Sequence, residues 1–81
     1  MEIEEQLNEE TDKWLARIRN ERKKIIATDD KGKDLLKNID AYIEDTEHFR
    51  KNNDPVHAFE AVVWAWSWLE ICKELGILKN E

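Results

Sequence analysis

The chain has 81 residues, of which 41% are hydrophobic and 40% charged, and its 13 basic and 19 acidic residues give a net charge of −6. A chain of this length predicts one domain, over residues 1–81, with a single small core, and its negative charge disfavours nucleic acid and anionic membranes as partners. The chain has one cysteine, Cys72, so it cannot form a disulfide within itself. No apolar run reaches the roughly 18 residues of a membrane-spanning helix. We therefore expect a cytoplasmic protein without membrane contact.

The first segment with helical periodicity covers residues 2–27. Its apolar residues recur mostly in steps of three, four and seven, the spacing that places side chains on one face of a helix. They are Ile3, Leu7, Trp14, Leu15, Ile18, Ile25 and Ile26. Acidic residues crowd the first turns and basic residues the last ones, an order that the helix dipole favours. The segment therefore predicts an amphipathic helix over 2–27.

The sequence TDDKGK, residues 28–33, interrupts this pattern. Thr28 belongs to the residue types that cap helix N-termini, and two aspartates behind it suit a first turn. A second apolar face then follows. Its members are Leu35, Leu36, Ile39, Tyr42, Ile43, Thr46 and Phe49. We expect a second helix over 29–52, with Gly32 leaving open a start as late as Asp34.

The sequence KNNDP, residues 51–55, marks the clearest boundary in the chain. Its two asparagines favour leaving a helix. Asp54 followed by Pro55 is typical of an N-cap and the first helical residue, because the fixed φ of proline suits that position and its missing N–H is not needed there. A third helix is therefore predicted over 55–75.

Gly76 is expected to end the third helix, and Ile77 and Leu78 to return onto the other helices. Short connections make sequential helices neighbours in space. The predicted fold class is therefore all-α, an antiparallel up-and-down three-helix bundle. The predicted core residues are Trp14, Leu15, Ile18, Ile39, Ile43, Ala58, Val62, Ala65, Trp68, Leu69 and Cys72.

Three tryptophans alternate in the third helix, at positions 64, 66 and 68. On a helix this spacing places large rings on both sides of a stripe of smaller residues. The stripe comprises Ala58, Ala61, Val62, Ala65, Leu69 and Cys72. Phe59, Val63 and Trp66 share one flank, and Trp64 and Trp68 lie on the other. Two interpretations stay open: the rings fill the wedges between helices, or the Phe59, Val63 and Trp66 flank is exposed and binds a protein partner or a second copy.

The segment from about residue 35 to residue 78 resembles a known family. Tyr42, Asp45 and Phe49 form a Y-x-x-D-x-x-x-F pattern, which NDPVHAFEA, WAWSWLE and LGIL follow in that order. These motifs are similar to those of a small archaeal family, domain of unknown function 357. The resemblance implies a short up-and-down three-helix bundle. It implies no activity, because none is established for that family.

The resemblance to the family also holds at individual positions. The positions that match the family are Tyr42, Asp45, Phe49, Asp54, Ala58, Ala61, Ala65, Trp68, Leu69 and Gly76. Trp64 stands where the family usually has tyrosine, Ser67 where it has glycine and Glu70 where it has aspartate. Tyr42, Asp45 and Glu70 are therefore family-like polar positions of unknown role, which either form a site or brace the bundle.

Motifs with a known chemistry are sparse. Asp45 and His48 have the spacing of the carboxylate-x-x-His element of di-iron bundles, but those bundles need two such elements and further carboxylates. Asp45 and Glu70 would make an acid–base pair only if two helices brought them together. Cys72 is expected to be a buried small hydrophobe. Because there is no phosphate loop, nucleophile elbow or zinc spacing, we expect no catalytic, cofactor or metal site, and no enzyme.

The end of the first helix carries a basic run that is interrupted by Glu21. The run comprises Arg17, Arg19, Arg22, Lys23 and Lys24. It is the candidate footprint for nucleic acid, and it also suits a solvated helix end. The main hypothesis for function is a small non-catalytic protein-interaction module using the aromatic flank of the third helix. The alternative is a nucleic-acid-associated accessory protein using this basic end.

Overall fold

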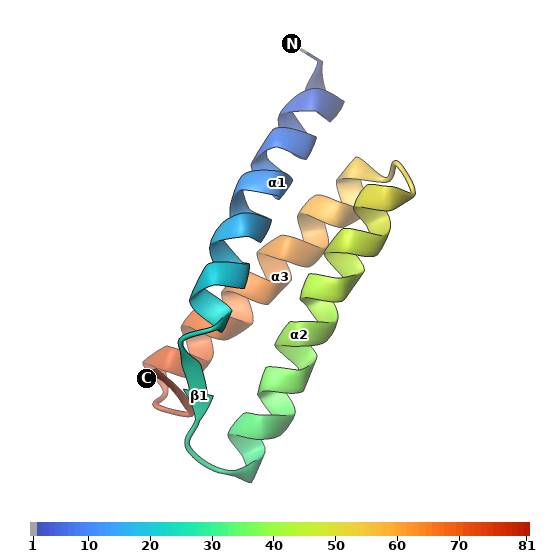
Figure 1. Cartoon of the computed structure of the whole chain (residues 1–81). Coiled ribbons are helices and arrows are strands. Elements are labelled where there is room, and N and C mark those ends of the chain that lie inside the picture. The colour runs from blue at the N-terminus through green and yellow to red at the C-terminus, as the bar shows by residue number, and fades with distance from the viewer. Residues whose placement is uncertain (1) are drawn as a thin grey trace.

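The computed structural model describes residues 2–81 and contains three helices and a two-stranded sheet. The helices are α1 (Ile3–Arg22), α2 (Asp30–Lys51) and α3 (Pro55–Glu74), and the strands are β1 (Ile25–Ala27) and β2 (Leu78–Asn80). In Figure 1 the chain descends through α1, returns through α2 and descends again through α3, and the body measures 43 × 18 × 17 Å. The prediction of an all-α fold is confirmed for the helices, and the small sheet is an addition that the sequence did not predict.

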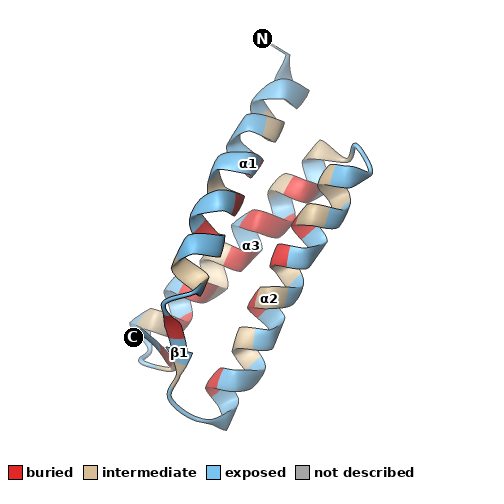
Figure 2. Ribbon diagram, in the orientation of Figure 1, coloured by how far each residue is buried: buried red, intermediate tan, exposed pale blue. Residues whose placement is uncertain are grey.

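The hydrophobic core lies along α3, which packs most extensively against α2 and less against α1. Figure 2 shows the buried residues in red on the facing sides of the helices. The predicted core residues that are buried are Leu15, Ile18, Ile39, Ile43, Ala58, Val62, Ala65, Leu69 and Cys72. Two threonines, Thr11 and Thr46, are also fully buried. The hydroxyl of Thr46 donates to the carbonyl of Tyr42 at 2.8 Å, so a helical carbonyl satisfies it inside the core.

Two predicted core residues, Trp14 and Trp68, are only partly buried and pack against the edge of the core. The reason is the small size of the residues at its centre. Ala58 and Ala65 are wholly buried on α3, and alanine allows neighbouring helices to approach closely. The space left between such helices is too narrow for an indole, which must lie at the flank.

Helix α1 ends at Arg22, short of the predicted end at residue 27. The residues that follow form β1, which pairs antiparallel with β2 and places Ile25 opposite Asn80. Ile25 and Leu78 are 4% and 1% exposed, so both strands turn an aliphatic side chain onto the core. A β-branched residue such as Ile25 is well suited to a strand. The apolar periodicity alone predicts Ile25 as part of the helix, which is wrong.

The N-cap of α2 is Asp29 and not Thr28. The Asp29 carboxylate accepts a hydrogen bond from the backbone N–H of Gly32 at 2.8 Å, which satisfies one of the free donors of the first turn. The hydroxyl of Thr28 instead donates to the carbonyl of Ile77 at 3.0 Å, and its N–H donates to the same oxygen at 3.1 Å. Thr28 therefore ties the connection before α2 to the segment after α3.

Helix α3 begins at Pro55, the residue at which the sequence predicts its start. The Asp54 side chain caps it by accepting from the N–H of His57 at 3.2 Å. Asn53 completes the preceding turn with a positive φ of 55°, a conformation that asparagine tolerates. Beyond the helix, Gly76 takes a φ of 73°, which breaks the helical path and sends the chain back towards β1.

Ion pairs join the basic end of α1 to α2. Arg22 donates two hydrogen bonds to the Asp40 carboxylate, at 2.7 and 3.0 Å. Arg19 lies 2.9 Å from the carboxylate of Glu47. Two of the three guanidinium groups in this basic run, those of Arg19 and Arg22, are thus paired with carboxylates of the same chain.

Replacement of Gly32 by alanine tests how closely the sheet end packs on α2. Within a helix this change normally stabilises by up to about 1 kcal/mol. Here the new Cβ would lie 2.7 Å from the carbonyl oxygen of Ile77 and 3.1 Å from the Cβ of Ala27. We therefore expect Gly32→Ala to lower the free energy of unfolding, measured in urea, by about 1–3 kcal/mol. The exposed neighbour change Lys31→Ala should alter it by less than about 0.5 kcal/mol, and an unchanged Gly32→Ala variant would contradict the close contact.

Leu78 and Leu75 form a matched pair for testing the role of β2. Leu78 is 1% exposed, whereas Leu75 is 68% exposed only three positions earlier. We expect Leu78→Ala to cost about 2–5 kcal/mol of unfolding free energy, as for other buried leucines, and Leu75→Ala to cost less than about 1 kcal/mol. Thermal and urea unfolding of both variants provide the measurement. Equal losses would show that β2 is not part of the core.

The ion pair between Arg50 and Asp12 predicts a pH dependence of stability. Arg50 donates to both oxygens of Asp12, at 2.7 and 2.8 Å, and these hydrogen bonds hold the pKa of the carboxyl below its usual value. A carboxyl pKa that is lowered by folding contributes stability above its unfolded-state value, and this stability is lost as the pH falls through the folded-state value. We expect Asp12→Asn to cost less than about 1 kcal/mol at neutral pH, because the pair is largely exposed.

The difference between Asp12→Asn and the native protein should shrink below about pH 4 and disappear near pH 2. Urea unfolding at a series of pH values measures it. A difference that stays constant down to about pH 2 would mean that the carboxylate charge plays no part.

Candidate functional site

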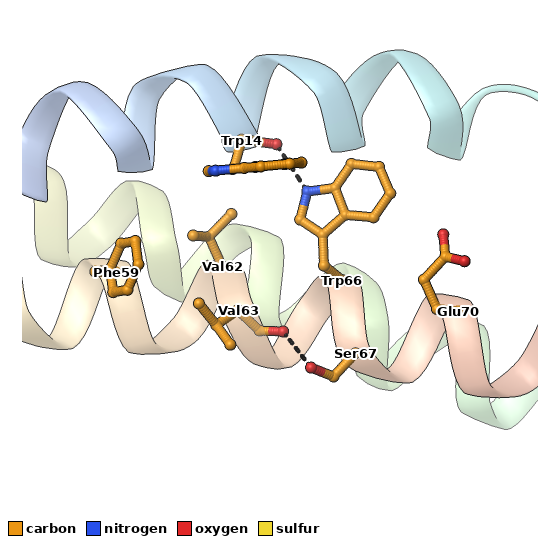
Figure 3. A pocket seen from close by; sticks show the side chains of 7 residues that line it. All are labelled: Trp14, Phe59, Val62, Val63, Trp66, Ser67 and Glu70. Carbon is orange, nitrogen blue, oxygen red and sulfur yellow. Dashed lines mark hydrogen bonds between the residues drawn. The ribbon is translucent and has the colours of Figure 1, made fainter.

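An apolar groove of about 390 Å³ lies between α1 and α3. We call it the α1–α3 groove. Its lining residues are Trp14, Phe59, Val62, Val63, Trp66, Ser67 and Glu70. Figure 3 shows the two indoles between the helices, with the phenyl ring and the valines beside them on α3. The three residues that the sequence predicts as a partner-binding flank, Phe59, Val63 and Trp66, all lie in this groove.

Trp66 forms part of the wall of the groove and also holds α3 against α1. Its Nε1–H donates to the backbone carbonyl of Trp14 at 3.1 Å, and the two rings meet edge to face with centroids 5.7 Å apart. Trp66 is half-buried, whereas Val63 is 45% exposed. Trp66 therefore fills the wedge beside the core, as the first interpretation expects, and Val63 remains open to solvent, while partner binding stays a prediction.

Charged residues of α1 surround Trp14. Its Nε1–H donates to a carboxylate oxygen of Glu10 at 3.1 Å, and the guanidinium of Arg17 lies 4.8 Å from its ring centroid. Lys13 bridges to the same carboxylate at 3.0 Å. The hydrogen bond from Lys13 is the largest cause of a lowered pKa at Glu10. The α1 wall of the groove is thus an indole hydrogen-bonded to Glu10, with the cations of Lys13 and Arg17 over its ring.

The α3 wall offers apolar surface and carboxylates but no reactive group. The hydroxyl of Ser67 donates to the carbonyl of Val63 at 2.8 Å, so it is bonded to its own helix. Glu70 is exposed at the edge of the groove. Such an arrangement suits the burial of an apolar side chain from another molecule.

The three family-like polar positions do not come together. Tyr42 stacks on Trp64, with ring centroids 6.3 Å apart and planes 17° from parallel. Asp45 is exposed on α2, and Glu70 lies on the α1–α3 groove. Over residues 2–81, no hydrogen bond or ion pair joins any two of Tyr42, Asp45 and Glu70. Tyr42 braces α2 against α3, and the structure assigns no shared site to the three.

The histidines and the cysteine make local contacts or lie in the core. His48 contacts Asn52, and Nδ1 of His57 lies 2.7 Å from the carboxylate of Asp54 at the start of α3. Burial raises the pKa of the Cys72 thiol. Within the described part of the chain, no three His, Cys, Asp or Glu residues are grouped so as to hold a metal ion. Over the same residues, no helix combines the length and the apolar character that crossing a membrane requires.

The contribution of α1 to the groove does not follow from the sequence. The sequence predicts Trp14 as a core residue, and Ser67 stands out only as a departure from a family motif. One signal for Trp14 was present, because Glu10 and Arg17 lie one turn before and after it and place it at the border of the apolar face. Periodicity does not say how far such a border residue is covered by the neighbouring helix.

Comparison with known proteins extends the match beyond the segment noted in the sequence. The family model for proteins of unknown function DUF357 matches residues 8–78, which includes most of α1. No curated protein matches the chain. The crystal structure of protein AF1782 from Archaeoglobus fulgidus, attributed to the same family, is 45% identical and superposes with a TM-score of 0.91. That likeness covers 99% of this chain and 100% of the other. The chain therefore belongs to the DUF357 family.

Proposed function

We propose that this protein is a small non-catalytic protein-interaction module whose docking surface is the α1–α3 groove. The observation that carries the proposal is the composition of the groove, which is lined mainly by aromatic and aliphatic side chains and leaves Val63 45% exposed. Aromatic residues that surround a pocket are typical of the few positions that supply most of the binding energy in protein interfaces.

The groove is well prepared for a partner. The hydrogen bond from Trp66 to the backbone of Trp14 fixes the two rings relative to each other. A binding surface that is already ordered loses little conformational entropy when a partner arrives. This order in the groove supports a docking role.

The alternative role in nucleic-acid binding has less support. Its footprint was the basic end of α1, but Arg19 and Arg22 are engaged with Glu47 and Asp40 of α2. Binding of phosphate would have to compete with these ion pairs. It would also act against the net charge of −6.

We also infer that the three helices form an antiparallel up-and-down bundle within one domain. The tight turn between α2 and α3 supports this, because a connection of so few residues suits antiparallel neighbours. The pairing of β1 with β2 supports it further, since it brings the end of the chain back beside the connection that precedes α2.

A charge placed at Val63 tests the docking function. Val63→Glu should fold, because the side chain is half-exposed, and should reduce capture of a partner from native cell lysate by at least about tenfold, as expected for an interface centre. Quantitative mass spectrometry of proteins retained by the immobilised chain gives the measurement. Trp66 is a poor choice for the substitution, because its ring also holds α1 to α3.

The matched control is Asn38→Glu, which adds the same charge at an exposed position of α2. It should retain the same proteins as the native chain. If Val63→Glu and the native chain retain identical sets, or neither retains any protein, the groove is not a docking surface.

A further inference from the structure

The solvent-facing side of α3 carries a second apolar stripe besides the one that faces the core. Its members, Val56, Phe59, Val63 and Trp66, follow in steps of three and four. Val56 and Val63 are 60% and 45% exposed. This spacing is the one by which one helix packs alongside another, and within residues 2–81 no helix covers the Val56 end of the stripe. The geometry fits a helical occupant better than an extended one.

The charges that α3 itself carries beside this stripe are carboxylates, while α1 places Lys13 and Arg17 over the Trp14 ring on the opposite wall of the groove. Glu60 lies between Val56 and Val63 on the helix surface, and Glu70 and Glu74 continue the row. All three are exposed, and within the described residues none forms an ion pair. The lysine of α3, Lys73, points away to Glu21 of α1, 3.3 Å from its carboxylate. The open face of α3 is therefore apolar and negatively charged.

A second copy of this chain does not complement that surface. Its exposed apolar helix faces lie on α3, whose other flank of Trp64, Ile71 and Leu75 also borders Glu70 and Glu74, and on the first turns of α1, where Ile3 is 74% exposed. Glu4 and Glu5 follow Ile3 directly. Either contact would bring carboxylates against carboxylates, between two molecules that each carry a charge of −6. Like charges placed opposite each other oppose association.

We propose that the α1–α3 groove receives an amphipathic helix of another protein, whose apolar stripe is flanked by lysine or arginine on the side that meets α3. The inference rests on the docking function proposed above and names the chemistry of the partner. The apolar side chains of that helix lie against Phe59, Val63 and Trp66, and its cations lie beside Glu60 and Glu70. The helix then packs beside α1 and α3 as a fourth helix.

Two designed peptides test this chemistry. Both have about 18 residues, roughly the length of the open face of α3, and both carry leucines at heptad positions, a fluorescent label and no tryptophan. One has lysine at the remaining positions and the other glutamate. Fluorescence anisotropy should show binding of the leucine–lysine peptide and at least about tenfold weaker binding of the leucine–glutamate peptide, with the difference falling as salt rises.

Substitutions in the protein separate seating in the groove from simple attraction of charge. Val63→Glu and Val56→Glu make the protein more negative, yet each should weaken binding of the lysine peptide by about tenfold, because each places a charge on the apolar stripe. Asn38→Glu should change binding by less than about twofold. The double variant Glu60→Gln/Glu70→Gln should weaken binding severalfold and flatten its salt dependence. Circular dichroism confirms that each variant is folded.

Several results would overturn the proposal. Undiminished binding of the lysine peptide to both valine variants would mean that net charge alone attracts it. Equal binding of the two peptides would remove the role of the carboxylates. A dimer in sedimentation that Val63→Glu dissociates, with no peptide bound, would make a second copy the occupant. If capture from lysate depends on Val63 while the lysine peptide does not bind, the docking function stands and only the partner chemistry fails.

Discussion

The close approach of helices along the small residues of α3 determines most of what this molecule presents to solvent. Ala58 and Ala65 are wholly buried, and the large rings of α3 are displaced to its two sides. On one side Trp64 stacks on Tyr42. On the other Trp66 meets Trp14 and bonds to its backbone. The α1–α3 groove exists because the centre of the core is too narrow to take those rings.

Charge is distributed differently on the two sides of the molecule. Carboxylates of α2 neutralise arginines at the end of α1, and these pairs join the two helices that otherwise contact each other least. The carboxylates on the open side of α3 have no such partners within residues 2–81. Within these residues, carboxylates without an ion-pair partner and exposed apolar side chains thus lie side by side along α3, next to the groove.

The sequence predicted the helical elements well because each is a local property. The apolar period of α2 and the Asp54–Pro55 start of α3 depend on residues within a few positions of one another. The sheet escaped prediction because β1 is only three residues long and pairs with a strand more than fifty positions later. No residue near Ile25 indicates that it pairs with a strand at the end of the chain, so the apolar periodicity predicts it as part of α1.

The part of the candidate site that lies on α3 was predictable from the sequence, and the part on α1 was not. Phe59, Val63 and Trp66 share a side of α3 by helical geometry alone, and they do line one groove. That Trp14 forms the opposite wall depends on the rotation of α1 about its own axis, which tertiary packing sets. Asp45 and Glu70 were candidates because they occupy family-like positions, but occupying such positions does not bring two side chains into contact.

The pairing of β1 with β2 has a consequence for how the chain folds and opens. It closes a loop that encloses the whole of α2 and α3, and closing a long loop carries a large entropy cost that helix contacts between neighbours in sequence do not. We therefore expect the α2–α3 hairpin to form before the sheet. Opening of the sheet would also free the backbone of the Ile77 segment from Thr28, because both contacts hold the end of the chain to the connection before α2. Local opening at this end of the molecule leaves the α1–α3 groove intact, since Trp14 and Trp66 hold it independently of the strands.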